Sequence, residues 1–416
     1  MALITKTRRN LLLIIFFAVI GIFAIRQMGN AALRHAVDSY TSKSGPLTSA
    51  SYSPAEVKKS FNMATWLRAG VQLIDLEGEE RGFLRKLIQK NAVQMDNPEL
   101  KQVAELVQRN ELPLQLLYRA VPLTESSLDL RYADGMELEI PNLLEYLQTS
   151  FLLGARWRME MVKQDFPAAF QTAVVQERIA SALTHEPVAI TGLIGHVPEK
   201  DFYEFLHRNI HSADEQMLLK EIEYLKHLKA MAAPLDRVIA ADGAAVYSSM
   251  STEFLKDDYF QQEPLSASRR MTLRTSYILN RPYFLANLLE TYTEYSQYAR
   301  RPVAEISQDS IDQSWIAKMF FSSNVDSLVR RYQAQEAARN LALTAVTTRL
   351  HGLQKGAYKK PVELPRSVYT GETAEFRTLP DGSLEISFPK TIKMWDQKFA
   401  KAPPERPRLQ WRLPPL

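Results

Sequence analysis

Residues 143–183, LLEYLQTSFLLGARWRMEMVKQDFPAAFQTAVVQERIASAL, contain two amphipathic patterns separated by one polar break. In the first, apolar residues recur every three or four positions from Leu144 to Val162. In the second, apolar residues occupy Phe166 and the positions three, four, seven and eight residues later. Such spacing places the apolar side chains on one face of a helix. The stretch therefore predicts a helical hairpin that closes near residue 186.

The hairpin, with its Gln-Asp-Phe turn followed by Ala-Ala-Phe, resembles the turn region of tetratricopeptide-type helix pairs. Pairs of that type are stacked, because one pair cannot bury its apolar face alone. The unit does not recur in this sequence at a strict period. We therefore expect a mainly α fold whose body is an irregular α-solenoid or a helical bundle.

Helical spacing continues on both sides of the hairpin, and strand-like alternation is scarce before residue 370. The clearest segment, Asp214–Met231, begins with acidic residues and carries basic residues toward its end, which complements the helix dipole. We expect an all-helical body over residues 60–325. Further helices are predicted at Asp201–His211, Pro234–Met250, Arg269–Leu289 and Ser314–Arg330.

Residues 326–389 change in character. A long helical pattern runs from Asp326 to Leu353, and two short alternating segments then flank Leu379-Pro380-Asp381-Gly382, a turn signal that predicts a β-hairpin. We expect a small α+β module made of one long helix and this hairpin. The arrangement resembles the soluble part of type II secretion pseudopilins, but the amino terminus lacks their cleavage signal, so assembly into a pilus is not expected.

The amino terminus carries an unbroken apolar run from Leu11 to Ile25, preceded by three basic residues and followed by Arg26. A helix of this length covers roughly 22 Å, so the flanking residues have to help it cross a hydrocarbon core of ~30 Å. We predict a stub and transmembrane anchor at residues 1–34, then a linker at 35–59. The residues that define the anchor are Arg9, Leu11, Ile15, Phe16, Ile20, Ile25 and Arg26.

A cleavable secretory signal has similar features, but Arg26 and the poor site at residues 29–31 favour an uncleaved anchor. Because the positive charges precede the helix, its amino terminus is expected in the cytoplasm of a bacterial cell and the body in the periplasm. The chain has no cysteine, so it can form neither a disulfide nor a cysteine metal site.

Basic charge gathers at the two ends of the chain. Residues 1–34 carry five Lys or Arg and no acid, and residues 390–416 carry seven against two acids. The middle is therefore mildly acidic, which gives no support to nucleic-acid binding. The Pro-rich tail at 390–416 is expected to be extended, either as a docking segment or as disordered chain. Its proposed contact residues are Pro403, Pro404, Arg406, Pro407, Arg408, Trp411, Arg412, Pro414 and Pro415.

Several loose patterns together resemble a family of uncharacterised membrane-anchored helical proteins common in planctomycetes and acidobacteria. The likeness covers about residues 60–200 and 325–388 and includes Asn62–Ala69, Leu116–Ala120, and the hairpin that ends at His185-Glu186-Pro187. The resemblance implies a membrane-anchored helical protein of the bacterial envelope. It implies no reaction and no catalytic residue.

No complete catalytic motif is present. Glu204, His207 and His211 could share one helix face and offer ligands to zinc, but the stretch lacks the glutamate of zinc proteases, so we expect a surface pair and no metal or other cofactor. The function we expect is a membrane-anchored periplasmic scaffold or accessory protein that binds other envelope proteins. The alternative is a cell-wall or glycan hydrolase that uses carboxylates, and oligomeric state stays open.

Overall fold

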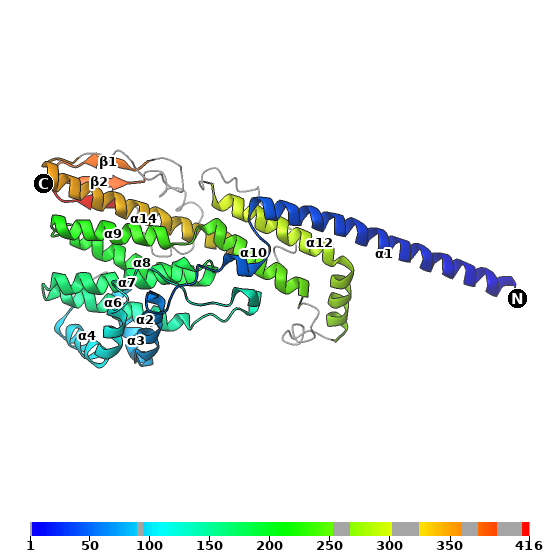
Figure 1. Cartoon of the computed structure of the whole chain (residues 1–416), viewed down its shortest axis with the longest axis horizontal. Coiled ribbons are helices and arrows are strands. Elements are labelled where there is room, and N and C mark those ends of the chain that lie inside the picture. The colour runs from blue at the N-terminus through cyan, green and yellow to red at the C-terminus, as the bar shows by residue number, and fades with distance from the viewer. Residues whose placement is uncertain are drawn as a thin grey trace.

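The computed structural model of this chain describes residues 2–89, 95–252, 267–301, 324–358, 373–388 and 410–415. At 2–19, 89, 252, 267–279, 324–327 and 330 it describes the backbone alone. The protein is mainly helical with one small antiparallel sheet, which confirms the predicted fold class at that level. Figure 1 shows the helices of the body gathered at one end and α1 projecting from the other.

Helix α1, Ala2–Lys43, is a single helix of 42 residues. Its carboxyl-terminal part packs along α12, Ala267–Ala299, and a core cluster joins both to α10, Leu235–Thr252. Ala36 and Tyr40, one turn apart on α1, are fully buried in this cluster. The segment 35–43, expected to begin a linker, therefore continues the first helix, because its small and aromatic side chains fill a helix interface.

The projecting part of α1 exposes apolar side chains. Ile20, Ile22, Phe23 and Ile25 are 46–63% exposed, and Arg26 is exposed as well. Arg9, Leu11, Ile15 and Phe16, the other predicted anchor residues, lie outside the side chains that the structure describes. Within the described part of the chain, no helix combines the length and the apolar character needed to cross a bilayer.

Four short helices cover one side of the body: α2, Met63–Leu73; α3, Gly78–Gln89; α4, Asn97–Arg109; and α5, Glu111–Tyr118. Two of them have strong start signals. Asn62 caps α2 by accepting a hydrogen bond from the Ala64 amide, and Asp96 forms a capping box with Glu99 at the start of α4. These caps fix where the helices begin and aim their apolar faces at α6 and α7.

The predicted hairpin is present as α6, Leu143–Val162, and α7, Phe166–His185. Asp165 at the break accepts a hydrogen bond from the Ala168 amide and so starts the second helix. All side chains of α7 from Thr172 to Thr184 are buried. The surrounding helices α2, α5, α6, α8 and α9 all contact α7, which is thus the central element of the body.

Helices α8, Ala189–Asn209, α9, Glu215–Met231, and α14, Asn324–Lys355, complete the body. The pattern at Asp201–His211 marks only the second half of α8, because Pro198 stands inside that helix rather than before it. Two short 3-10 turns, Ser49–Tyr52 and Tyr132–Glu137, contact each other and α10, between the body and the α1 region.

The sheet has the order β1–β2–β3, from Glu375–Thr378, Leu384–Ser387 and Gln410–Leu413. The predicted hairpin is confirmed, with Phe376 opposite Ile386 and Gly382 at a φ of 78° in the turn. The third strand is extended, as expected for the tail, but it pairs with β2 instead of standing free as a docking segment or disordered chain. Trp411 and Leu413 alternate with polar residues, so both side chains face the chain's own core against α14.

Candidate functional site, a groove between three helices

A groove of about 860 Å³ opens between α3, α6 and α8, with α14 and β3 at its end. Each of the three helices lines it with side chains three or four positions apart, as one helical face requires. The volume lies in the range of small-molecule and peptide-binding clefts. Its main lining residues are Arg81, Arg85 and Ile88 of α3; Leu144, Leu147 and Phe151 of α6; and Val197, Lys200, Asp201, Glu204 and His207 of α8.

The groove is lined by more basic than acidic side chains. Four Lys or Arg side chains line it against two acids. Both acids are engaged within the protein, since Asp201 pairs with Arg158 at 2.8 Å and Glu204 pairs with Arg208 at 2.6 Å. Arg208 lies outside the lining. Arg81 and Arg85 are exposed and occupy one face of α3, so the groove presents positive charge to solvent.

The floor of the groove is a buried polar network centred on Asp201. One carboxylate oxygen accepts hydrogen bonds from Trp157 Nε1–H at 2.9 Å and from Gln176 Nε2–H at 2.6 Å, and the other faces Arg158. Arg158 is only 1% exposed and stacks on the Trp157 ring at 4.1 Å. Because charged groups this buried need partners, each member of the network fixes the others.

The opposite wall of the groove is apolar. Leu144 is 55% exposed, and Leu147 and Phe151 follow it on the same face of α6, each partly buried. At the far end, Trp411 of β3 lies edge-on to His207 with ring centroids 5.1 Å apart. The groove thus combines a cationic rim on α3 with aliphatic and aromatic surface.

Two of the three candidate metal ligands are engaged in other contacts. Glu204 pairs with Arg208, and His207 packs on Trp411. Burial, with Arg349 and Arg412 nearby, lowers the pKa of His211. Throughout the described ranges, no group of three or more His, Asp or Glu side chains is placed to hold a metal ion.

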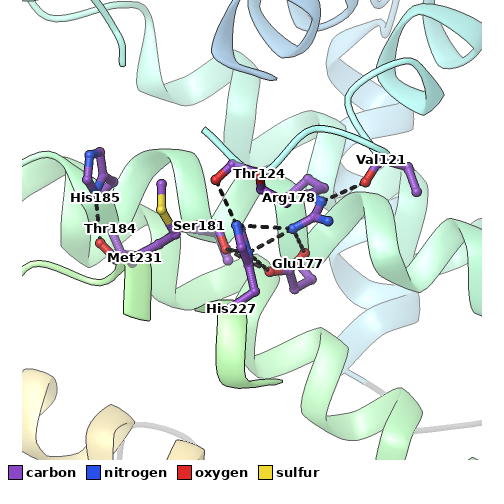
Figure 2. Close-up of polar contacts among 10 residues, drawn as sticks. Val121, Thr124, Glu177, Arg178, Ser181, Thr184, His185, His227 and Met231 are labelled. Atoms are coloured by element: carbon purple, nitrogen blue, oxygen red, sulfur yellow. Dashed lines mark hydrogen bonds and ion pairs between the residues drawn. The ribbon is translucent and has the colours of Figure 1, made fainter. Parts of the chain in front are cut away.

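A second cluster, on the far side of α7, contains the residue types of a hydrolytic triad. Figure 2 shows His227 of α9 reaching toward Glu177 and Ser181 of α7 and toward the chain at Thr124. His227 Nδ1 lies 3.0 Å from Glu177 Oε1 and 3.5 Å from Ser181 Oγ. His227 Nε2 lies 3.0 Å from the Thr124 carbonyl oxygen.

The geometry of this cluster does not serve nucleophilic catalysis. In a triad the serine and the carboxylate contact different nitrogens of the histidine. Here both lie near Nδ1, the Ser181 hydroxyl donates to Glu177 at 2.8 Å, and both side chains are fully buried. Arg178 adds an ion pair to Glu177 at 3.2 Å and a hydrogen bond from its Nε–H to the Val121 carbonyl. The cluster therefore joins α7, α9 and the segment after α5.

Glu221 is another buried acid outside the groove. It is 0% exposed, and its Oε1 accepts a hydrogen bond from Asn209 Nδ2–H at 3.0 Å. Burial is the main reason that its pKa is raised to about 8. A carboxyl of this kind is held in its neutral form by the fold near pH 7.

The tail residues fall into two groups. Pro403, Pro404, Arg406, Pro407 and Arg408 lie outside the described residues. Of the others, Trp411 is 2% exposed in the chain's own core, and Arg412 donates from Nε–H to Ser383 Oγ at 2.9 Å while pairing with Asp381. Pro414 and Pro415 follow the strand. The described end of the tail is thus occupied by contacts within the molecule.

The chain matches no family model, no curated protein and no solved structure. The likenesses drawn from the sequence are therefore expectations that these comparisons do not test.

The groove itself was not predicted. Sequence analysis singled out Glu204 and His207, which do line it, but for metal binding. The other lining residues come from elements up to about 330 positions apart in the chain. One feature of the sequence could have indicated the groove. Arg81 and Arg85 are one turn apart on a short amphipathic helix, and Ile88 follows about one turn later.

Proposed function

We propose that this protein is a single-pass, membrane-anchored scaffold or accessory protein of the bacterial cell envelope that acts by binding other proteins. The observation that carries the proposal is the exposed apolar surface on the projecting part of α1. Single exposed apolar residues are ordinary, but a cluster of large ones usually marks an interaction surface.

The arrangement of these side chains favours lipid as their environment. Successive residues of a helix are rotated by about 100°, so Ile20, Ile22, Phe23 and Ile25 point to different sides of α1. One partner helix would cover one face, whereas lipid surrounds all of them. Transfer of each such side chain from water stabilises the inserted state by about 1.5–3 kcal/mol. The sequence continues the apolar run toward the amino terminus to Leu11.

The orientation follows from charge. Lys6, Arg8 and Arg9 precede the apolar run without any acid, which favours retention of the amino terminus in the cytoplasm. In this proposal the body, from α2 to β3, lies in the periplasm. The absence of cysteine suits an oxidising compartment.

The polar clusters support a binding role over a catalytic one. Asp201 and Glu204 in the groove are engaged with arginines, and Ser181, Glu177 and His227 bond to one another and to backbone without a free nucleophile. A hydrolase of the expected type needs two carboxylates that can exchange protons with a substrate. The groove instead offers an open, positively charged surface.

Membrane fractionation of cells that express the full chain tests the proposal. We expect the protein in the membrane fraction, resistant to alkaline carbonate and released by detergent. In spheroplasts, added protease should digest the body, which would place it outside the cytoplasmic membrane. A variant with Ile15→Asp and Ile20→Asp should shift to the soluble fraction. Recovery of the unmodified chain in the soluble fraction, or protection of its body in intact spheroplasts, would contradict the proposal.

A further inference from the structure

We propose that the groove between α3, α6 and α8 binds an acidic segment of a partner protein that also carries bulky apolar side chains. This inference rests on the proposed function for the idea that the chain acts through protein partners. It adds the place of contact and the chemistry of the segment that occupies it.

The acidic character follows from the rim. Arg81 and Arg85 are exposed and lie one turn apart on the groove face of α3. The acids of the groove are already neutralised by Arg158 and Arg208. Carboxylates of a ligand would therefore meet the two exposed guanidinium groups of Arg81 and Arg85, which favours acidic sequences and speeds their association.

The apolar character follows from the opposite wall. Leu144, Leu147 and Phe151 present aliphatic and aromatic surface at one-turn spacing, and Trp411 closes the end. A binding site for a purely ionic or sugar-like ligand would leave this surface in water. Leu or Phe side chains of an acidic peptide would cover it, as amphipathic segments do when they fill helical grooves.

Position argues for a protein segment over a lipid headgroup. The elements that form the groove lie at the end of the molecule opposite the amino terminus of α1 (Figure 1). Helix α1 alone, with 42 residues, is about 63 Å long. Lipids around residues 11–25 therefore lie far from the rim, whereas a periplasmic partner can reach it.

The floor gives the groove a fixed shape. Asp201 is held by three side chains, and the Arg158 guanidinium lies between Asp201 and the Gly154 carbonyl, to which it donates at 2.9 Å. A Cβ on Gly154 would lie 2.5 Å from Asp201 Oδ2, so the close approach of α6 and α8 depends on that glycine. A preformed site loses little conformational entropy on binding.

Fluorescence polarisation with the purified full chain in mild detergent tests the proposal. The probe is a labelled synthetic peptide that combines Glu with Leu and Phe, and the reference is the same peptide with every Glu replaced by Gln. We expect saturable binding of the acidic peptide, weakened by salt, and at least roughly tenfold weaker binding of the Gln peptide.

Matched variants locate the site. Arg81→Glu combined with Arg85→Glu should weaken binding of the acidic peptide roughly tenfold or more, since each change replaces attraction by repulsion. Lys86→Glu is the control, because Lys86 is exposed on the same helix but does not line the groove. Leu147→Ala should weaken binding without changing its salt dependence. Circular dichroism checks that all variants stay folded.

Three outcomes would overturn the proposal. These are equal binding of the acidic and Gln peptides, equal loss of binding in the Lys86→Glu control, and displacement of the peptide from the unmodified chain by detergent micelles that contain phosphatidylglycerol but not by the same micelles without it. The last would assign the rim to lipid. None of these outcomes affects membrane fractionation, so failure of the groove proposal and failure of the anchor proposal are distinguishable.

Discussion

Removal of the Asp201 carboxylate should be among the most destabilising single changes in the body. In Asp201→Ala, the Arg158 guanidinium loses its anion while it remains 1% exposed. Breaking a buried ion pair from one side costs about 3–5 kcal/mol. Trp157 and Gln176 also lose the oxygen that accepts their hydrogen bonds, each a further cost of about 1–3 kcal/mol before relaxation. Because the three contacts share one carboxylate, the costs overlap, and we expect about 3–5 kcal/mol in total.

The measurement is equilibrium urea unfolding of the full chain in mild detergent, followed by tryptophan fluorescence. Trp157 is a buried reporter inside the affected network. The control is Lys101→Ala, which removes an exposed ion pair with Glu105 whose atoms lie 3.9 Å apart. That change should cost no more than about 1 kcal/mol.

A second variant separates charge from packing. Arg158→Met combined with Asp201→Ala removes both charges, so it should be more stable than Asp201→Ala alone even though it changes more residues. The reasoning fails if Asp201→Ala loses no more stability than Lys101→Ala. It also fails if the double variant is less stable than the single one, because the unpaired Arg158 would then not be the source of the loss.

Three further predictions concern other parts of the body. Because the pKa of Glu221 is raised to about 8 in the folded protein, this carboxyl still holds a proton near pH 7, whereas in the unfolded chain it has released it above about 4.5. The free energy of unfolding should therefore fall as pH rises from about 4.5 to about 8. Glu221→Gln should flatten the stability profile in that window by up to about 1.4 kcal/mol per pH unit, measured by urea unfolding at several pH values. A Cβ on Gly192 would overlap the Tyr332 hydroxyl and lie 2.6 Å from its Cζ, so Gly192→Ala should cost about 1–3 kcal/mol, whereas Gly82→Ala, with nothing within 4 Å, should gain up to about 1 kcal/mol. Trp411→Ala should release β3, seen as faster protease cleavage near the carboxyl terminus; an unchanged cleavage rate would contradict the packing described for that strand.

Local signals accounted for much of the secondary structure. The α6–α7 hairpin, α9, α14 and the β1–β2 hairpin each coincide with a sequence pattern read from periodicity, caps or turn residues. The helices among these elements have strong apolar faces. The turn of the hairpin has a positive φ at Gly382, which glycine adopts more easily than other residues. The information that specifies them lies within each segment.

The sequence patterns did not predict which distant segments of the chain pack against one another. Residues 35–43 looked like a linker because only Ala36, Tyr40 and a few weakly apolar neighbours signal burial, and their partners lie about 200 to 250 positions later in α10 and α12. Trp411 looked like a free ligand because its strand partner, Ile386, is not adjacent in sequence. The groove also depends on long-range placement, since α3, α6, α8 and β3 meet there without sharing a motif.

The enclosure of α7 has a consequence for how this chain can be made and cut. Because α7 is covered by α2, α5, α6, α8 and α9, an emerging nascent chain can complete the surroundings of that helix only after residue 231 has left the ribosome. Fragments that stop earlier would leave apolar side chains of α7, such as Ala173 and Ala180, without the α9 residues that share their core cluster. We therefore expect fragments that begin or end within residues 63–231 to be bound by chaperones or degraded. Fusion proteins should fold only when they keep this whole stretch.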